Sequence, residues 1–237
     1  MVDLVVVRHA QSTWNAEGRW QGWADPPLTA LGRDQAVRAA AGLRAHPPVR
    51  VIASDLRRAA ETGGTIAAAL GRPCALDADL REYDAGEWSG LRRSEISARW
   101  PDDLAAWDAG VLDRTPGGED PRALVARMRR AVCRAADEGA VHAVDAAAAA
   151  GGPAPGAAAA ADAGPHTGLW SPIGPWVLVV SHGRAINALV AALGGRPARI
   201  GHLEGWELVT RDEREEPPDP IPGRPVRLLA DSLAGAG

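Results

Sequence analysis

Residues 4–9, Leu-Val-Val-Val-Arg-His, decide the fold that we expect of this chain. Four apolar residues, three of them β-branched, stand together, and such a run is typical of a strand buried on both faces. Strands of this kind belong to parallel sheets covered by helices on each side. The run stops abruptly at Arg8 and His9, so two chemically active side chains directly follow the predicted strand.

Along the rest of the chain, segments typical of buried strands alternate with segments in which apolar residues follow the 3.6-residue period of a helix. Further strands are predicted at 49–53, 74–76, 176–180, 206–209 and 226–229. Helices are predicted at 29–43, 57–70, 120–136 and 185–193, and one or two short helices, broken by Pro101, at 91–107. Thr29 and Asp120 have the chemistry of N-caps. This alternation predicts an α/β fold, a three-layer α/β/α sandwich around a mostly parallel sheet.

The length of 237 residues fits a single domain, residues 1–237, with two departures from a plain alternation. A helical excursion is expected at about 91–137. A segment at about 144–168 consists almost entirely of Ala, Gly and Pro, which offer little surface for a core, and we interpret it as an inserted loop. The Pro-rich acidic stretch 213–225 is expected to connect the last two strands.

Composition excludes several classes of function. The formal net charge is −4, which argues against a nucleic-acid partner. The first apolar run is too short for a signal peptide or a membrane span, so we expect a cytoplasmic protein without a membrane partner. Cys74 and Cys133 are interpreted as small core residues in a reducing compartment. All 26 basic residues are arginine, so the abundance of arginine is not itself a functional signal.

Charged and polar groups follow three of the predicted strands. The carboxyl ends of parallel strands meet at one edge of a sheet, so these groups are expected to converge in one pocket. Arginine forks match phosphate oxygens, a helix N-terminus favours anions, and a neutral imidazole can attack phosphorus. The pattern therefore indicates phosphoryl chemistry carried by the groups Arg8-His9, Ser54-Asp55 with Arg57-Arg58, and Ser181-His182-Gly183.

Four segments, in this order, resemble the motifs of the histidine phosphatase superfamily, the phosphoglycerate-mutase-like fold. They are VVVRHAQSTWNAEGRWQG at 5–22, SDLRRAAET at 54–62, LREYDAGEWSG at 80–90 and VVSHG at 179–183. The stretch PGGED at 116–120 resembles a fifth. Any one of these alone is a weak signal, but together they cover most of residues 1–210 and are specific.

The resemblance implies roles for individual residues. His9 would be the nucleophile and Glu82 the proton donor. It implies that no cofactor and no metal take part. The remaining groups would bind the phosphoryl group or the substrate: Arg8, Arg58 and His182, with Asn15, Gln21, Gly22 and Gly183. Ala10 stands where the family most often has glycine, and residues 201–209 lack an asparagine often found there.

Three functions remain open at this point. The leading one is a metal-independent hydrolase that acts on a small phosphorylated metabolite through a phosphohistidine. The second is a phosphoglycerate-type mutase, which Asp84 disfavours because an acidic side chain would repel a second phosphate. The third is a catalytically inactive module that binds a phosphorylated ligand. A homodimer is compatible with each.

Other polar and aromatic residues have competing interpretations. Asp84 is the rival of Glu82 for the role of acid. Paired histidines also bind metals, but the neighbouring arginines would repel a cation. The side chains of Trp14, Trp20, Trp23 and Trp88 either line a pocket or pack at the rim of the core, and Arg184 and Glu204 are not decided. His46, His142, His166 and His202 are expected at the surface or in loops.

Overall fold

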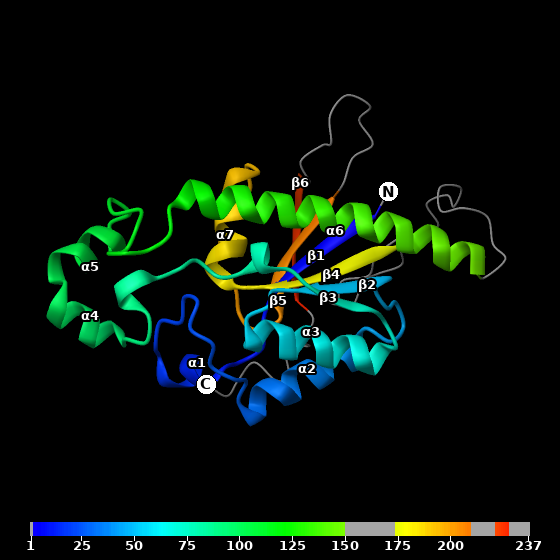
Figure 1. Ribbon diagram of the computed structural model, residues 1–237, viewed down its shortest axis with the longest axis horizontal. Helices are drawn as coiled ribbons and strands as arrows, with labels where there is room; N and C mark the ends of the chain where they lie inside the picture. The colour runs from blue at the N-terminus through cyan, green and yellow to red at the C-terminus, as the bar shows by residue number, and fades with distance from the viewer. Residues whose placement is uncertain (1, 150–173, 210–220, 228–237) are drawn as a thin grey trace.

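A six-stranded sheet lies at the centre of the computed structural model, which describes residues 2–149, 174–209 and 221–227 (Figure 1). The strand order is β3-β2-β4-β1-β5-β6. The first four run parallel, β5 is antiparallel to β1, and β6 is antiparallel to β5. The strands are β1 (Asp3–Arg8), β2 (Arg50–Ala53), β3 (Cys74–Leu76), β4 (Trp176–Ser181), β5 (Glu204–Val209) and β6 (Ile221–Arg227).

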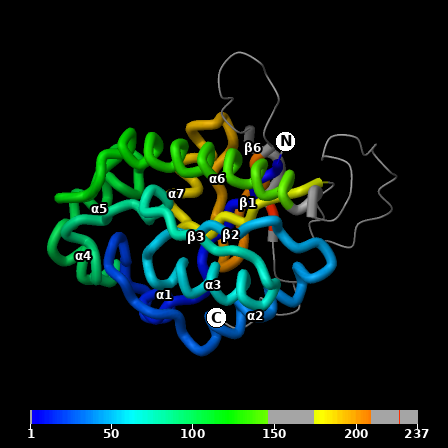
Figure 2. Tube along the Cα trace, turned by 45° about the vertical axis from the view of Figure 1, so that its right-hand side comes forward, coloured from blue at the N-terminus to red at the C-terminus, as the bar shows by residue number. Residues whose placement is uncertain are grey.

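Helices cover both faces of this sheet, which confirms the three-layer sandwich (Figures 1 and 2). α2 (Ala30–Gly42) and α3 (Arg57–Leu70) lie on one face, and α6 (Pro121–Ala149) and α7 (Gly183–Ala192) on the other. Alternate residues of β1 serve the two cores: Leu4 and Val6 belong to the cluster with α6 and α7, and Val5 and Val7 to the cluster with α2 and α3. Burial on both faces is why the strand has no polar residue between Leu4 and Val7.

The helical excursion projects from one end of the sandwich (Figure 1). It contains α4 (Arg93–Arg99) and α5 (Pro101–Asp108), preceded by 3₁₀ turns at Ala78–Leu80 and Gly86–Trp88. Pro101 begins α5, where a missing N–H costs nothing. The excursion packs back through Trp107, whose ring lies 5.5 Å from Trp20 and 5.6 Å from Trp88, centroid to centroid. A short helix that the sequence pattern missed, α1 (Thr13–Glu17), lies at the same end.

Two predicted boundaries were wrong. The helix expected to end near residue 136 continues as α6 to Ala149, because alanine-rich sequence extends a helix readily. It therefore takes in the first part of the predicted insert, whose residues 150–168 lie outside the described residues. β6 begins at Ile221, within the stretch predicted to be a connector. Its two prolines are tolerated because β6 is an edge strand and the pairing is irregular between Trp206 and Leu208.

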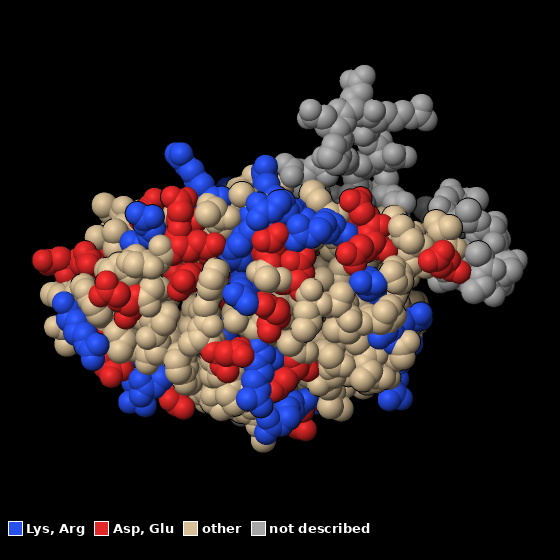
Figure 3. All heavy atoms as spheres, viewed as in Figure 1, with Lys and Arg blue, Asp and Glu red and all other residues tan. Residues whose placement is uncertain are grey.

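The expectation that both cysteines are core residues was also wrong. Cys74 is exposed rather than a core residue, because β3 is the other edge strand, and Cys133 is half-buried. Within the described residues, neither cysteine takes part in a disulfide. Figure 3 shows basic side chains beside acidic ones on the face where α6 lies. Arg134 of α6 forms ion pairs with Asp77 and Asp79. None of the described helices combines the length and apolar character needed to cross a bilayer.

Candidate active site

The ends of two adjacent central strands bring His9 and His182 together. β1 and β4 pair in parallel with Arg8 opposite Ser181, and the backbone N–H of His9 donates to Ser181 O at 2.9 Å. Each histidine is the next residue after its strand, so the two rings lie with centroids 5.1 Å apart. Both side chains are buried. The convergence predicted from the strand ends is thus present.

The contacts of His9 define which nitrogen is free to react. Nδ1 lies 2.7 Å from the carbonyl oxygen of Ala10, an acceptor only, so Nδ1 carries the proton. Nε2 therefore holds the lone pair. Burial, and then the charges of Arg58 and Arg8, hold the pKa of His9 well below its usual range. A neutral imidazole with an unprotonated Nε2 is the form required of a nucleophile.

Arg58 lies directly beside that nitrogen. Its Nε is 3.3 Å from His9 Nε2, and its two terminal nitrogens donate to Ala24 O at 2.8 Å and Gly22 O at 2.9 Å. The side chain is fully buried, and burial lowers the pKa of its guanidinium to about 10. Gly22 has a φ of +48°, and a Cβ there would lie 2.8 Å from Ala85 N, so the loop that anchors Arg58 requires glycine.

Two further arginines, Arg8 and Arg57, have different surroundings. Arg8 is half-buried at the end of β1 and donates to Ile200 O at 3.0 Å. Arg57 points to the surface, where its side chain is 55% exposed and pairs with Glu61. The motif threonine Thr62 accepts the backbone N–H of Ala10 at 3.2 Å and donates to Arg58 O at 2.6 Å, which links the loop of His9 to α3.

His182 is fully buried, as Arg58 is. It does not line the cavity itself, and neither ring nitrogen has a hydrogen-bond partner among the described residues. Burial, followed by the charge of Arg58, holds its pKa well below the usual range. An unpaired buried imidazole is costly unless a ligand completes it. Gly183 follows as the first residue of α7, beside the side chain of Arg8.

The N-terminus of α7 holds the predicted acid. Glu82 Oε1 accepts the N–H groups of Ala185 and Tyr83, each at 2.9 Å, and Oε2 accepts that of Arg184 at 3.4 Å. The sequence predicted that these first amides of α7 face an anion. Two of these amides, those of Arg184 and Ala185, donate to the carboxyl group of Glu82.

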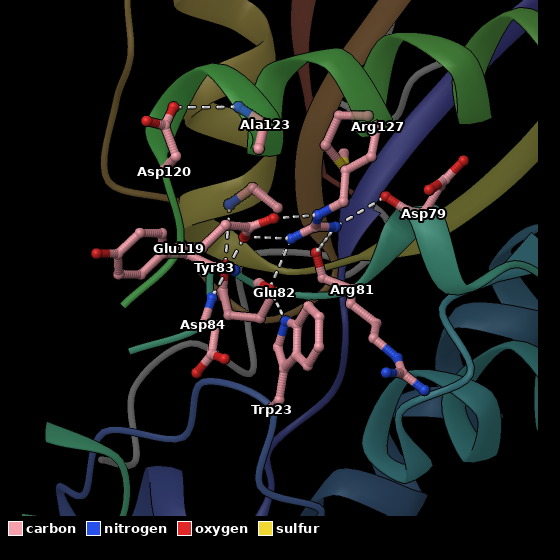
Figure 4. A network of polar contacts seen from close by, with 12 residues as sticks. Trp23, Asp79, Arg81, Glu82, Tyr83, Asp84, Glu119, Asp120, Ala123 and Arg127 are labelled. Atoms are coloured by element: carbon pink, nitrogen blue, oxygen red, sulfur yellow. Dashed lines mark hydrogen bonds and ion pairs between the residues drawn. The ribbon is translucent and has the colours of Figure 1, made fainter. Parts of the chain in front are cut away.

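A second layer of polar contacts fixes the backbone beneath Glu82 (Figure 4). Arg127 of α6 donates to the carbonyl oxygens of Asp79, Arg81 and Glu82 and pairs with Glu119. Glu119 belongs to the PGGED stretch, whose next residue, Asp120, caps α6 through Arg122 N and Ala123 N. The periodicity of α6 gave no signal that Arg127 faces inward.

Asp84, the rival acid, does not line the cavity. Its side chain accepts the N–H of Gly86 at 3.0 Å and shapes the turn. Asp84 is therefore not placed to repel a second phosphate, which removes the main sequence argument against a mutase.

The amides of Asn15 and Gln21 are oriented by their neighbours. Ser12 N donates to Asn15 Oδ1 at 3.1 Å in the capping box of α1, and Ser12 Oγ donates to Gln21 Oε1 at 2.7 Å. With their oxygens occupied, the two NH₂ groups are left for a ligand. Both residues line the cavity.

His202 lies in the turn before β5, in agreement with the expected surface or loop position, but its closeness to the site was not predicted. Its ring lies 6.3 Å from that of His9, and its Nε2 is 3.3 Å from Asn15 Oδ1. Burial lowers its pKa to about 4. The next residue, Leu203, is the one non-glycine position among the described residues with positive φ, +59°, and its N–H donates to Arg8 O. His46 is exposed and His142 contacts Arg50; both lie outside the site, and His166 lies outside the described residues.

These groups open into one cavity of about 260 Å³. Of the four tryptophans considered from sequence, Trp20 lines it, Trp88 is buried, and Trp23 donates to Glu82 O at 2.8 Å. Glu204 Oε2 accepts the backbone N–H of Gly201, so its side chain stabilises the turn before β5. In the described part of the chain, no group of three or more His, Cys, Asp or Glu residues is arranged to hold a metal ion. The full lining is Arg8, His9, Asn15, Arg19, Trp20, Gln21, Gly22, Arg58, Glu82, Tyr83, Ala85, Trp107 and Arg184.

Known proteins similar to this chain were found by sequence and by structure. A glucosyl-3-phosphoglycerate phosphatase of Mycolicibacterium vanbaalenii is 40% identical over 116 residues, which span 49% of this chain and 52% of that protein. The chain thus spans about half the length of this relative. A probable phosphoglycerate mutase GpmB of Photorhabdus laumondii is 32% identical over 84% of this chain and 77% of its own length.

The structural comparison agrees. A mycobacterial glucosyl-3-phosphoglycerate phosphatase solved with VO3 is 31% identical and superposes with a TM-score of 0.63, covering 81% of this chain and 82% of that one. The family model of the histidine phosphatase superfamily, branch 1, matches residues 4–150. With this match over more than half of its length, the chain belongs to the histidine phosphatase superfamily.

Proposed function

We propose that this chain hydrolyses small phosphomonoesters through a phosphohistidine on Nε2 of His9. The observation that carries the proposal is the contact between His9 Nε2 and Arg58 Nε at 3.3 Å. A phosphoryl group attacked by this nitrogen would lie against the Arg58 guanidinium, which would stabilise the charge on its oxygens. Arg8 supplies a second fixed positive charge, and Asn15 and Gln21 supply neutral donors.

The reaction runs in two steps. In the first, the lone pair of His9 Nε2 forms an N–P bond while the P–O bond to the alcohol breaks, and Glu82 gives its proton to the departing oxygen. In the second, the Glu82 carboxylate takes a proton from water as the water oxygen bonds to phosphorus. The N–P bond then breaks, its electron pair returns to Nε2, and inorganic phosphate leaves. The arginines provide the positive charge, so neither step calls for a metal ion.

The mutase is kept as the second candidate because relatives named as probable phosphoglycerate mutases match most of the chain. A mutase returns the phosphoryl group to a bound acceptor, and the position of Asp84 outside the cavity does not oppose this.

One experiment separates the two candidates. The protein, freed of metals with EDTA, is incubated with a panel of sugar phosphates, nucleotides, phosphoglycerates and glucosyl-3-phosphoglycerate in ¹⁸O-labelled water. A phosphatase releases phosphate that carries one ¹⁸O atom from the solvent. Transfer to an added hydroxy acid without release of labelled phosphate would establish the mutase, and turnover that returns only with added metal would contradict both.

We also propose that residues 1–237 form a single domain and that the protein is cytoplasmic and has no nucleic-acid partner. A homodimer is compatible with the proposal. Light scattering of the purified protein tests for a homodimer.

A further inference from the structure

The loop between α1 and α2 contacts both the cation and the acid of the proposed reaction. Its carbonyl oxygens at Gly22 and Ala24 accept the terminal nitrogens of Arg58, the cation beside the phosphoryl group. Between these two residues, the indole Nε1–H of Trp23 donates to Glu82 O at 2.8 Å. We propose that Trp23 is a positioning residue that sets the acid Glu82 relative to Arg58. This inference rests on the proposed function.

The main chain of Glu82 depends on side-chain contacts for its position. The residue lies outside the helices and strands, between the 3₁₀ turns at Ala78–Leu80 and Gly86–Trp88. Its carbonyl oxygen accepts two donors, Nε1 of Trp23 and Nη2 of Arg127, each at 2.8 Å (Figure 4). A carbonyl oxygen has two lone pairs, so both are used. One donor comes from α6 and the other from the loop that also binds Arg58.

The two donors differ in how deeply they are embedded in the protein. Arg127 is buried and pairs with Glu119, so replacing it would leave a buried carboxylate without its partner and would disturb the fold. Trp23 is 42% exposed. Its removal from the contact should therefore cost little stability, which makes Trp23 the donor whose effect on the reaction is measurable apart from folding.

Arg81 holds the indole of Trp23 in place. The guanidinium Cζ of Arg81 lies 5.1 Å from the centroid of the Trp23 ring, within the range of a cation–π contact. Arg81 Nε in turn donates to Asp55 Oδ1 at 2.8 Å, and Asp55 follows the end of β2 by two residues. β2 is the neighbour of β4, the strand that His182 follows. The position of the indole is thus set by the sheet edge that carries the reacting groups.

Loss of the indole N–H should affect one event of the reaction. A general acid is effective only when it lies within hydrogen-bond reach of the departing oxygen, and small displacements are costly. Without Nε1–H, the carbonyl of Glu82 keeps a single donor and the acid is held less precisely. Arg58 keeps its acceptors, because these are backbone carbonyls that a change of the Trp23 side chain leaves in place. Proton transfer should suffer while stabilisation of the phosphoryl group does not.

The test is Trp23→Phe, which keeps an aromatic ring for Arg81 and removes only the N–H donor. The first step is measured by single-turnover kinetics on alkyl, phenyl and p-nitrophenyl phosphate. We expect a loss of about 3- to 10-fold on the alkyl ester, the value of one neutral hydrogen bond, and about 2-fold or less on the p-nitrophenyl ester, with phenyl phosphate between them. Trp14→Phe is the matched control, the same substitution outside the cavity, and should leave all three rates unchanged.

A double-mutant cycle separates a positioning role from a structural one. In a Glu82→Gln background, Trp23→Phe should have no further effect on the alkyl ester, because the proton that it helps to deliver is gone. Equal loss on all three esters, unchanged rates on all three, or additive losses in the double variant would each overturn the role of Trp23 and leave the proposed function intact. Failure of the wild-type protein to hydrolyse any of the esters would instead overturn the proposed function.

Discussion

The phosphoryl side of the cavity and its leaving-group side are built in different ways. His9, Arg58 and His182 are buried and come from strand ends and the first turn of a core helix. Glu82 and Trp107 are half-buried and come from segments outside the sheet, and Arg184 is exposed on the first turn of α7. The phosphoryl side is therefore as rigid as the core. The leaving-group side depends on how the excursion and α7 pack, and it can change its specificity without altering the chemistry.

Glu82→Gln should produce the largest separation between the two sides. Loss of the general acid should slow the first step by about 10²- to 10⁴-fold for alkyl phosphates, whose alkoxide leaves poorly without a proton. The same step with p-nitrophenyl phosphate should slow much less, because nitrophenolate leaves unaided. Single-turnover kinetics measures this step apart from water attack. Equal loss on both esters would rule out Glu82 as the leaving-group acid.

Arg58→Ala should act on the phosphoryl side and affect all substrates alike. Removing one preorganised donor at the reacting phosphoryl group should cost about 10²- to 10³-fold in kcat, whatever the alcohol. Arg57→Ala is the matched control, because Arg57 is the adjacent residue on the same helix and points to the surface. Steady-state kinetics with three unrelated esters provides the readout. Similar losses in the two variants would show that Arg58 supports the fold and not the reaction.

Variants of His202 test whether the turn before β5 contributes to the phosphoryl side of the cavity. Removing its hydrogen bond to Asn15 Oδ1 should lower kcat/KM by about 3- to 10-fold, the value of one neutral hydrogen bond. His202→Gln should recover part of the loss by supplying an N–H donor, and His202→Ala should not. In an Asn15→Ala background, His202→Ala should have no further effect. Additive losses in this double-mutant cycle would show that His202 does not act through Asn15.

The last effect concerns stability at acid pH and not catalysis. His9, His182 and His202 have folded-state pKa values below their usual value, so below pH 6.5 the unfolded chain binds more protons than the folded chain. Stability should therefore fall as pH falls from 7 to 5, by up to about 1.4 kcal/mol per pH unit for each histidine. Urea unfolding measures it, and His202→Asn should flatten the slope by up to one proton. An unchanged slope would contradict the buried, neutral state of His202.

The same contrast explains what sequence could reveal. The phosphoryl side was predictable because a strand buried on both faces leaves an unmistakable apolar run, and whatever follows it must lie at the sheet edge. The first turn of the predicted helix placed both Arg57 and Arg58 near the site, and it was the resemblance to the family motif that selected Arg58. These are local patterns, and they lead directly to side-chain positions.

The leaving-group side was not predictable in the same way. Trp107 and Arg184 are far apart in sequence and meet only because α5 packs back onto the site. His202 was missed because it reaches the site through a turn with Leu203 at positive φ, a conformation that leucine does not signal. In this segment the sequence showed only that an asparagine often found in the family is missing, which does not identify His202 as a neighbour of the site.

The central claim is that phosphorus becomes bonded to Nε2 of His9, and trapping this bond tests it most directly. The protein is mixed with a ³²P-labelled ester, quenched in alkali within one turnover, digested and analysed by mass spectrometry. The account predicts label that is stable in base and labile in acid, located on the peptide that contains His9, and absent from His9→Ala, whose kcat should fall by about 10⁴-fold or more. Label on another residue, or near-normal turnover by His9→Ala, would contradict it.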